Sequence, residues 1–529
     1  MSFYRRGIFI IPATIILSAV LGGVYGPRVG AQSSASEENV RKTIESITSV
    51  LGTVEMQYAD PVDAQKAIYG GAIPGMLTSL DPHSNFFDPK SFAAMREDQR
   101  GRYYGVGMQV APRNGRTVVM APFPGSPAYK AGLRPGDVIW QVDDSLTEGL
   151  NTTEVANLLK GPRGTTVRVQ AMREGTPEPL KFVIIRDEIP RFSVEHAHMI
   201  EPGVGYLRIS SFMETTSSEL RDHLRDMSAE GLTGLVVDLR GNPGGLLKEG
   251  VSVAETFLQR GQAIVSHKGR NSREQQYSAS RAARGSEFPL VILIDRSSAS
   301  AAEIVSGAVQ DHDRGLIVGE PSFGKGLVQT VFPLSENTGL ALTTAKYYTP
   351  SGRLIQRDYS SLSLYDYFND TNKAAGTVSQ TDVHQTDTGR TVYGGGGITP
   401  DVSFSPPKPN EFQLTLARRD VFFKFASRYL AENKSISKEF EVTQPVVERF
   451  KRFLKEEDVA YEGADFEANL DFIKQRVKIQ LVLVEFGMND AYRVEAIHDP
   501  SIKKAIEMLP LAGSMLENTR RAQLEKEKR

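Results

Sequence analysis

Three serines follow an apolar segment in the stretch LIDRSSASAAEIVSGAVQDH, residues 293–312, at the point where a helix is expected to begin. Ser300 stands three residues before Glu303, which is the spacing of a capping box, where both side chains satisfy the first amides of a helix. A serine hydroxyl can instead be a nucleophile, provided that a base removes its proton. The stretch leaves both interpretations open for Ser300, while Ser297 and Ser298 stay candidates for capping.

The candidate base is a lysine in the downstream segment VGEPSFGKGLVQTVF. None of the eight histidines lies in a serine-hydrolase signature such as G-x-S-x-G, and His312 stands about 18 Å of helix away from Ser300. Lys325 lies between two glycines and beside Phe323, where apolar surroundings would lower its pKa from about 10.4 towards that of a general base. Gln329 could hold the lysine amine by its amide oxygen if the chain turns locally, because four residues of extended strand span about 13 Å.

Glycines at the end of another apolar strand form the third candidate element. The segment DLRGNPGG, residues 238–245, follows LTGLVV and precedes an expected helix. Backbone amides at such a strand–helix junction point outwards and suit an oxyanion hole. The alternative is a plain Pro-Gly turn. The segment lacks the Lys-Ser or Lys-Thr ending of a phosphate-binding loop, so nucleotide binding is not supported.

The bulk composition limits the classes of function. The chain has 529 residues, enough for roughly two to four domains, of which 40% are hydrophobic and 24% charged. Its formal net charge of −2 gives no reason to expect nucleic acid as a partner. The lack of cysteine excludes disulfides, cysteine metal sites and a cysteine nucleophile.

The N-terminus predicts export. Arg5 and Arg6 precede GIFIIPATIILSAVLGGVY, residues 7–25, an uncharged run about as long as the roughly 20 residues that span a bilayer. The small residues VGA at 29–31 would suit a signal peptidase. We therefore expect a protein of the periplasm or cell envelope. Residues 1–36 are then a cleaved signal peptide, or an inner-membrane anchor with its spacer, and the sequence does not separate the two.

Helical periodicity over residues 37–102 gives way to short strands and two helices over residues 103–190. Asn114 and Gly115 mark a hairpin, GSPAYKAGLRPGD holds a short helix, and VANLLKGPRGTTVRV fits a helix, a stop and a strand. With a Gly-rich loop these pieces resemble a PDZ domain, in which that loop offers backbone amides to the C-terminal carboxylate of a peptide. The peptide-binding candidates are Tyr104, Gly105, Val106 and Gly107. A β-rich module that only packs is the alternative.

Continuous apolar strands alternate with helices over residues 191–408, which predicts a sheet buried on both faces and hence an α/β core. Within this region residues 357–391 are polar with little periodicity, and we expect a long surface loop there. Residues 409–529 are charged and amphipathic, which predicts a C-terminal helical region that ends in a frayed tail, TRRAQLEKEKR.

Over residues 37–405 the chain resembles the carboxy-terminal processing peptidases, or tail-specific proteases. The resemblance rests on the combination of the PDZ-like module with the segments SSASAAEIVSGAVQD, GEPSFGKGLVQ, DLRGNPGG, LTSLDPHSNFFDP and GGGGITPDV. The resemblance implies an α/β multidomain fold with a ClpP/crotonase-like core, an inserted PDZ domain, N-terminal helices and a C-terminal helical region. It also implies three catalytic residues and two oxyanion amides, namely the nucleophile Ser300, the base Lys325, its support Gln329, and Ala301 and Gly244.

The function implied by this resemblance is that of a serine endopeptidase of the cell envelope. It would capture free C-terminal tails of proteins or peptides with the PDZ domain and cleave by acyl transfer, with no metal or cofactor. In this family, helical regions such as residues 409–529 can mediate oligomers or contacts with adaptor proteins.

Two alternatives stay open. One is an inactive, membrane-tethered peptide-binding scaffold, against which the intact Ser300, Lys325 and Gln329 argue. The other is a crotonase-type acyl enzyme, which the PDZ-like module and the exported N-terminus disfavour.

Overall fold

The computed structural model describes residues 32–280, 288–369, 382–433 and 435–527. The expected signal or anchor at residues 7–25 lies outside these ranges. The chain divides into two compact units, Met1–Leu80 and Asp81–Arg529. Within the described ranges, no helix combines the length and apolar character that crossing a membrane requires.

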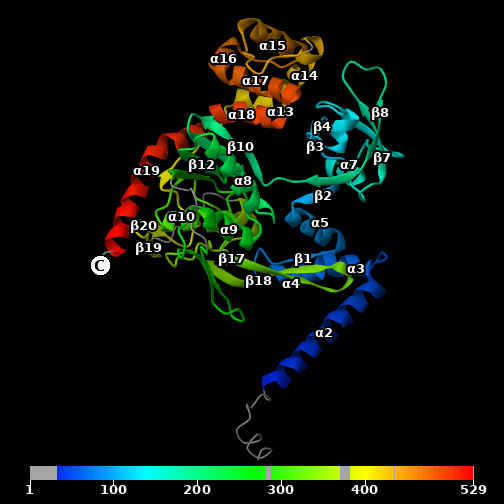
Figure 1. The fold of residues 1–529 in the computed structure, drawn as a ribbon. Coiled ribbons are helices and arrows are strands. Elements are labelled where there is room, and N and C mark those ends of the chain that lie inside the picture. Colours follow the sequence, from blue (N-terminus) through cyan, green and yellow to red (C-terminus); the bar gives the residue numbers. More distant parts are fainter. Residues whose placement is uncertain (1–31, 281–287, 370–381, 434, 528–529) are drawn as a thin grey trace, which may run out of the picture. The chain divides into compact units, whose positions relative to one another are not determined.

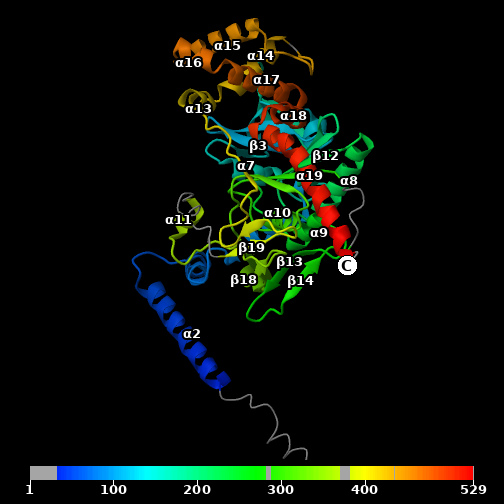
Figure 2. The same cartoon turned by 90° about the vertical axis from the view of Figure 1, so that its left-hand side faces the viewer.

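Helices make up the described part of the first unit, as the sequence predicts (Figure 2). They are α2 (Gln32–Gln57), α3 (Ala64–Ala67), the π-helical turn η1 (Ile68–Ala72) and α4 (Ile73–Thr78). Asp63 caps α3, because its side chain accepts a hydrogen bond of 3.1 Å from the amide of Lys66.

A small β-rich module follows α5 (Pro89–Arg100). Its antiparallel sheet contains β3 (Met108–Arg113), β4 (Arg116–Pro122), β5 (Val138–Val142), β6 (Ser145–Leu146), β7 (Thr166–Met172) and β8 (Leu180–Ile185), with helices α6 (Pro127–Ala131) and α7 (Thr152–Leu159). The strands β2 (Arg102–Gly105) and β9 (Asp187–Pro190) pair where the chain enters and leaves the module. The predicted hairpin is confirmed, because Asn114 and Gly115 join β3 to β4 with φ values of 50° and 72°.

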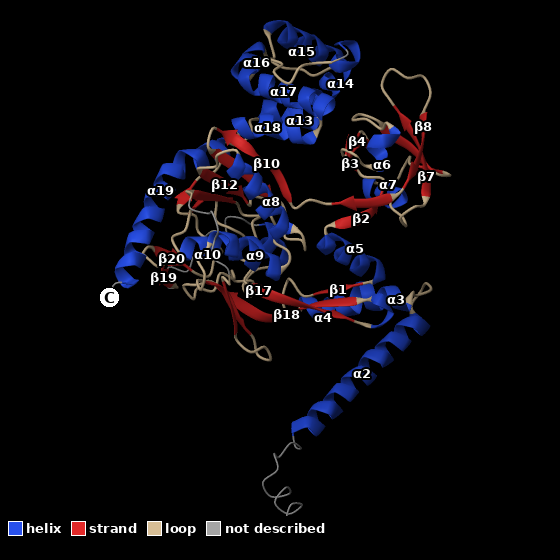
Figure 3. Ribbon diagram, viewed as in Figure 1, coloured by secondary structure: helices blue, strands red, loops and turns tan. Residues whose placement is uncertain are grey.

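The α/β core is built on a six-stranded sheet in the order β10-β11-β12-β15-β16-β21 (Figures 1 and 3). Only the edge pair β10–β11 is antiparallel. The strands are β10 (Val194–Glu201), β11 (Val204–Ile209), β12 (Gly234–Asp238), β15 (Leu290–Ile294), β16 (Leu316–Gly319) and β21 (Val402–Ser403). Every residue of β12, β15 and β16 is buried, which confirms the predicted two-sided sheet.

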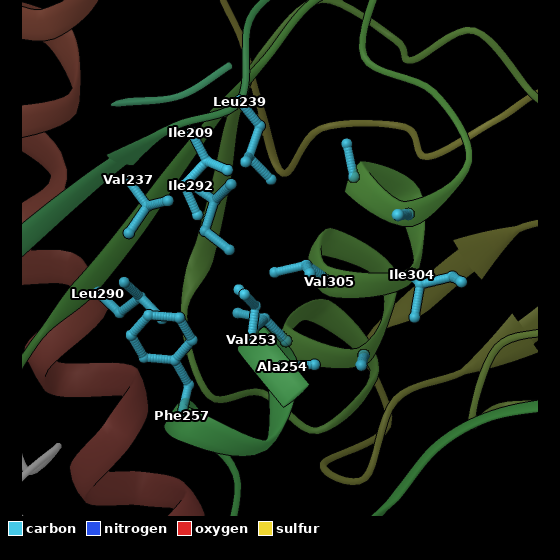
Figure 4. Close-up of a cluster of buried hydrophobic side chains, with 14 of the residues drawn as sticks. Ile209, Val237, Leu239, Val253, Ala254, Phe257, Leu290, Ile292, Ile304 and Val305 are labelled. Carbon is cyan, nitrogen blue, oxygen red and sulfur yellow. The ribbon is translucent and has the colours of Figure 1, made fainter. Parts of the chain in front are cut away.

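Helices cover both faces of this sheet, and alternate strand residues serve each face. Val237 and Ile292 pack with α9 (Leu247–Phe257) and α10 (Ala301–Asp311), as Figure 4 shows. Val236 and Val291 pack with α19 (Pro500–Glu527) on the other face. Because α10 is buried along its whole length, its first residue is held rigidly where β15 ends. The helix α8 (Thr216–Ala229) connects β11 to β12.

A second sheet brings distant segments to the start of α10. Its order is β1-β18-β13-β14, with β17 also paired to β18. The strands are β1 (Asn85–Phe87), β13 (Ala263–Lys268), β14 (Gln275–Ser278), β17 (Leu327–Pro333) and β18 (Gly339–Tyr348), and the turn η2 (Ser335–Asn337) joins the last two. Because β1 lies before the β-rich module and β18 long after it, the module is an insertion into the core.

The C-terminal region is helical, as predicted. It contains α13 (Glu411–Arg418), α14 (Val421–Asn433), α15 (Gln444–Glu456), α16 (Gly463–Ala468), α17 (Leu470–Phe486), α18 (Met488–His498) and α19. The prediction of a frayed tail is wrong for its described residues. The helix α19 continues to Glu527, Thr519 is 5% exposed and its hydroxyl donates to the carbonyl of Asp313 at 3.3 Å.

Residues 357–391 also hold more structure than the expected loop. The helix α11 (Leu364–Asn369) and a hairpin of β19 (Val383–Gln385) and β20 (Thr391–Tyr393) lie within or at the end of this stretch. Tyr367 of α11 is buried at 1% exposure, so a weakly periodic segment still contributes one side chain to the core.

Candidate active site

Ser300 stands at the sharp turn between β15 and α10, in a backbone conformation that serine rarely adopts. Its φ is 54° and its ψ is −113°, outside the main allowed regions for a residue with a Cβ. Such strain costs roughly 1–3 kcal/mol and persists only where the surrounding structure imposes it, so it points to a functional residue.

The neighbouring serines have different surroundings. Ser298 is fully buried; its hydroxyl donates to the carbonyl of Leu239 at 2.8 Å and accepts from the amide of Asp295 at 2.9 Å. Ser297 is exposed, and its amide donates to the Asp295 carboxylate. Ser298 therefore stabilises the turn between β15 and α10.

The fully buried Glu303 joins the start of α10 to the loop that carries Lys325. Its Oε2 accepts from the amides of Ser300 at 2.7 Å and Lys325 at 2.9 Å. Its Oε1 accepts from the Ser322 hydroxyl at 2.5 Å and the Gly324 amide at 2.6 Å. Burial raises the pKa of the Glu303 carboxyl, and these four hydrogen bonds oppose the rise. One carboxylate oxygen thus holds the backbones of both candidate catalytic residues.

Tyr347 of β18 makes a second bridge between the same two residues. Its hydroxyl contacts the carbonyl oxygen of Ser300 at 3.1 Å and also the carbonyl oxygen of Lys325. The side chain is 2% exposed, and burial raises the pKa of the phenol well above its usual value, so the hydroxyl keeps the proton that it donates. Glu303 and Tyr347 together fix the amides and the carbonyls of residues 300 and 325.

The surroundings of Lys325 shift its pKa in the direction that the sequence predicts. Burial lowers the pKa of Lys325, and the negative charges of Glu303 and Asp81 partly offset that effect. Within the described residues, Lys325 Nζ makes no hydrogen bond or salt bridge. The nearby Phe323 ring is covered by the guanidinium of Arg357, whose central carbon lies 3.7 Å from the ring centroid.

Gln329, the predicted support of the lysine, lies on β17 directly opposite Thr343 of β18. Its Nε2 donates to Thr343 Oγ1 at 3.3 Å. The described residues contain no hydrogen bond between Gln329 and Lys325, so a role for Gln329 in holding the amine stays a prediction.

The predicted oxyanion amides are close to the Ser300 side chain. A Cβ added to Gly244 would lie 2.7 Å from Ser300 Cβ and 3.0 Å from the Ala301 amide nitrogen. Gly244 also has a φ of 95°, so both backbone and space require glycine there. Its own amide donates to Asn242 Oδ1 at 2.8 Å, so it must leave or share that acceptor to bind an oxyanion. The Ala301 amide is at the first position of α10, where helix amides have no acceptor within the helix.

Sequence reasoning missed two side chains next to Lys325, although their segment LDPHS contributed to the resemblance. The interactions of Asp81 and His83 with Lys325 place both in its electrostatic environment. Burial, and then the charge of Lys325, lower the pKa of His83 to about 4, so His83 is neutral at pH 7. Its Nε2 is 2.8 Å from the Tyr367 hydroxyl. No sequence signal pointed to Tyr347 or Tyr367.

The Gly-rich loop of the β-rich module contains backbone donors without acceptors. The carbonyls of Tyr104, Val106 and Gly107 accept hydrogen bonds from within the module. Val106 and Gly107 are buried residues whose amides donate to no group in the described chain, whereas Tyr104 and Gly105 are strand residues paired with β9. Backbone amides inside proteins nearly always have an acceptor, so these two differ from the rest of the loop.

Two other features lie apart from these residues. A cavity of about 390 Å³ at the carboxyl ends of the parallel strands is lined by Arg208, Arg240 and Tyr492 among others, and its lining contains neither Ser300 nor Lys325. No group of His, Asp and Glu in the described ranges could hold a metal ion.

Three family models match the chain. They are "Peptidase family S41" over residues 203–360, "PDZ domain" over residues 118–173 and "Probable PDZ-protease, C-terminal helical domain" over residues 412–464. These matches confirm the predicted PDZ domain, the α/β peptidase core and the C-terminal helical region.

Individual proteins are similar over most of their length. A carboxy-terminal-processing protease of Bartonella bacilliformis is 38% identical over 359 residues, which are 67% of this chain and 79% of that protein. Carboxy-terminal processing protease CtpA of Bacillus subtilis is 31% identical over 357 residues, 66% of this chain and 74% of that protein. Among solved structures, a photosystem II D1 C-terminal processing protease is 31% identical, with 66% of this chain and 85% of that chain covered and a TM-score of 0.35.

Replacing Lys325 with methionine is expected to raise the free energy of unfolding at neutral pH. The pKa of Lys325 is lower in the folded than in the unfolded chain, so wild-type stability rises with pH between those two values. Methionine does not titrate. The advantage of Lys325→Met is therefore largest below the folded-state pKa and shrinks as pH rises towards about 10.4, the ordinary lysine value. Urea unfolding measured from about pH 6 to about pH 10 checks this.

Lys346 on β18 supplies the matched control. Its side chain is exposed, so Lys346→Met makes the same replacement on the second sheet without changing the buried site, and it serves as the reference for Lys325→Met. A Lys325→Met variant that differs from the wild type by the same amount at every pH would contradict a half-buried, perturbed Lys325.

Proposed function

The chain belongs to the carboxy-terminal processing proteases, which are serine-type peptidases, and from this premise we propose that Ser300 and Lys325 form its catalytic dyad. The observation that carries the proposal is the double bridge between these residues. Glu303 binds both of their amides and Tyr347 contacts both of their carbonyls. If Ser300 served only as a helix cap, nothing would require the backbone of Lys325 to be bound to the same two side chains.

The proposed reaction is acyl transfer. The neutral amine of Lys325 takes the proton of Ser300 Oγ as the oxygen attacks the peptide carbonyl, and the ammonium then returns it to the leaving amine. The Ala301 amide, with Gly244 after it releases Asn242, would stabilise the oxyanion. Water brought to the acyl-enzyme would complete hydrolysis, with Lys325 as the base again.

Two alternatives were open from the sequence; the site geometry weighs against one of them and the family membership against the other. An inactive scaffold has no need for a half-buried lysine held beside a strained serine, because each feature costs stability. A crotonase-type acyl enzyme would not explain the membership in the carboxy-terminal processing proteases.

Ser300→Ala and Lys325→Ala are each expected to lower kcat/KM for an unfolded protein substrate by at least about 10³-fold, because each removes one partner of a dyad that acts as a unit. Both variants should stay folded by circular dichroism. Cleavage is followed by gel and mass spectrometry, with exposed Ser297→Ala as the control that keeps wild-type activity. Full activity in Ser300→Ala would refute the dyad. A wild type that binds tailed peptides and never cuts them would favour the scaffold.

The PDZ domain is proposed to capture the free C-terminal carboxylate of the substrate. The unpaired amides of the buried residues Val106 and Gly107 support this role, since a carboxylate would supply the acceptor that they lack. The turn before α6 constrains the loop, because a Cβ on Gly107 would lie 2.6 Å from Ser126 Cβ. Tyr104 and Gly105, which belong to β2, would act through the position of this loop.

Amidating the C-terminus of a peptide substrate is expected to lower kcat/KM about 10-fold or more, chiefly through KM, since charge-assisted hydrogen bonds to the carboxylate are lost. Paired free-acid and amidated peptides are compared by steady-state kinetics. A third peptide, amidated but extended by one aspartate, keeps the charge without the terminal carboxylate and should behave as the amidated one. Equal turnover of all three would contradict tail capture.

The cell envelope is the proposed location. Its support is the basic flank Arg5 and Arg6 followed by the apolar residues 7–25, typical of a signal peptide or an anchor. The protein should then be found in the periplasm if the segment is cleaved, or with the inner membrane if it is kept. Deleting residues 1–31 should leave the protein in the cytoplasm. Cell fractionation with an antibody checks both statements, and an unchanged distribution after the deletion would contradict them.

Self-association and an adaptor protein remain proposals about partners. The first has support in the first unit. Val40, Ile44, Ile47 and Val54 of α2 are exposed and, with Leu51, recur at alternating spacings of four and three residues, the pattern of a helix that pairs with another helix.

A further inference from the structure

The orientation of the Gln329 amide decides whether it can help Lys325. A carboxamide has an acceptor oxygen at one end and a donor nitrogen at the other. Only the oxygen can accept a hydrogen bond from the ammonium that Lys325 becomes when it takes the serine proton. An amide turned the other way would present N–H groups to a cation and oppose its formation.

Thr343 lies beside Gln329, and its hydroxyl determines which end of the Gln329 amide faces Thr343. Thr343 directly opposes Gln329 across the β17–β18 pair, and its Oγ1 lies 3.3 Å from Gln329 Nε2. A threonine hydroxyl has a single proton. If that proton is given to another acceptor, the hydroxyl can only accept from Gln329, and the glutamine must offer its nitrogen.

We assign Asp81 as the acceptor for the Thr343 proton, because the Thr343 amide donates to Ser84, whose hydroxyl donates to Asp81, and Thr343 is among the groups that lower the pKa of Asp81. Burial raises the pKa of Asp81, but hydrogen bonds from Ser84, His83 and Thr343 outweigh that effect and leave the pKa lowered. An ionised carboxylate can only accept, so the Thr343 hydroxyl must donate to it.

Hydrogen bonds also hold the backbone around Asp81 and Thr343. The Thr343 amide donates to Ser84 Oγ at 3.1 Å, and Ser84 Oγ donates to Asp81 Oδ2 at 2.7 Å. The Asp81 carboxylate also accepts from the amides of His83 and Ser84, each at 2.8 Å. The segment 81–84 and the Thr343 strand position are therefore tied to each other at two places.

We propose that Asp81 and Thr343 are positioning residues that hold the Gln329 amide with its oxygen free to accept a hydrogen bond from the Lys325 ammonium. This inference rests on the proposed Ser300–Lys325 dyad. The direction of each hydrogen bond in the series follows from the carboxylate. Asp81 accepts from Thr343 and Thr343 accepts from Gln329, which leaves the Gln329 oxygen available to the ammonium that Lys325 becomes when it takes the serine proton.

Several charged or titratable groups lie around Lys325 or around its neighbours His83 and Phe323. They are Glu303 from α10, Asp81 and His83 from the segment before β1, Tyr347 from β18, Arg357 after β18 and Tyr367 from α11. Of these, Glu303 and Asp81 raise the pKa of Lys325 through their charge, and His83 is neutral. An accepting Gln329 oxygen would also raise it, because it stabilises the ammonium.

Thr343→Val keeps the shape of the side chain and removes the hydroxyl, which leaves the Gln329 amide free to turn. The kcat is expected to fall about 10- to 100-fold, the size of one hydrogen bond to a charged group, with KM unchanged. The rising limb of the kcat/KM pH profile should move to lower pH, because the ammonium loses an acceptor. Thr343→Ser should restore both quantities.

Thr344→Val is the matched control. Thr344 is the next residue of β18, and its hydroxyl pairs at 2.7 Å with that of Thr330 at an exposed position. Its removal changes the same strand by the same atoms and should leave kcat, KM and the pH profile as in the wild type.

A double-mutant cycle separates positioning from a general structural effect. If Thr343 acts through Gln329, Thr343→Val has no further effect on kcat once Gln329→Leu is present. The inference is overturned if the two effects multiply, if Thr343→Val behaves as the wild type, or if Thr344→Val loses as much activity. In each of these cases, an inactive Ser300→Ala variant shows that the proposed dyad is still supported. An active Ser300→Ala variant would instead refute the dyad itself.

Discussion

The buried Glu303 carboxylate is the interaction on which the rest of the site depends. It accepts four hydrogen bonds, from Ser300 and from the three donors Ser322, Gly324 and Lys325. Without these donors a carboxylate at this depth would be strongly unfavourable, and without the carboxylate the loop at residues 322–325 would have three buried donors without partners. Each side therefore imposes the conformation of the other. This mutual constraint can hold Ser300 at a positive φ that the local sequence would not choose.

The sequence could nominate the proposed reacting groups but not the groups that hold them. Ser300 and Lys325 were predicted from residue type, flanking glycines and the family resemblance, and the structure places both of their amides on one carboxylate oxygen of Glu303. Glu303 was correctly placed at the third position of α10, but the sequence interpretation made it a competitor of catalysis. The Ser-x-x-Glu spacing predicts only the capping box between these two residues, in which Glu303 accepts from the Ser300 amide. The bonds to Ser322, Gly324 and Lys325 cross from one loop to another, and no spacing along the chain encodes them.

The fold, too, could be predicted from the sequence only in part. The apolar patterns predicted the small strands of the β-rich module, the two-sided sheet and the C-terminal helices, because burial leaves a pattern in the sequence, and a resemblance then identified the module as a PDZ domain. The pattern failed where the buried residues were few. Tyr367 lies in a polar stretch that was interpreted as a loop, and Thr519 lies in a charged stretch that was expected to fray. One inward-facing side chain in a short element produces no period, although it is enough to fix that element on the core.

The environment of Lys325 also depends on how the chain enters and leaves the inserted PDZ domain. Asp81 and His83 precede the PDZ domain, whereas Lys325 and Thr343 follow it, so the two groups meet only if the chain returns beside its starting point. The pairing of β2 with β9 brings the entry and exit of the insertion together, and the pairing of β1 with β18 then aligns residues 85–87 with residues 339–341. Because Asp81 and Ser84 lie immediately before β1, this register places their side chains at Thr343. The contribution of Asp81 and His83 to the electrostatic environment of the proposed base is thus set by strand register, whereas Glu303 acts from the start of α10. Neither contact is encoded in the residues next to Lys325, which is why sequence reasoning could identify the lysine but not the charged groups around it.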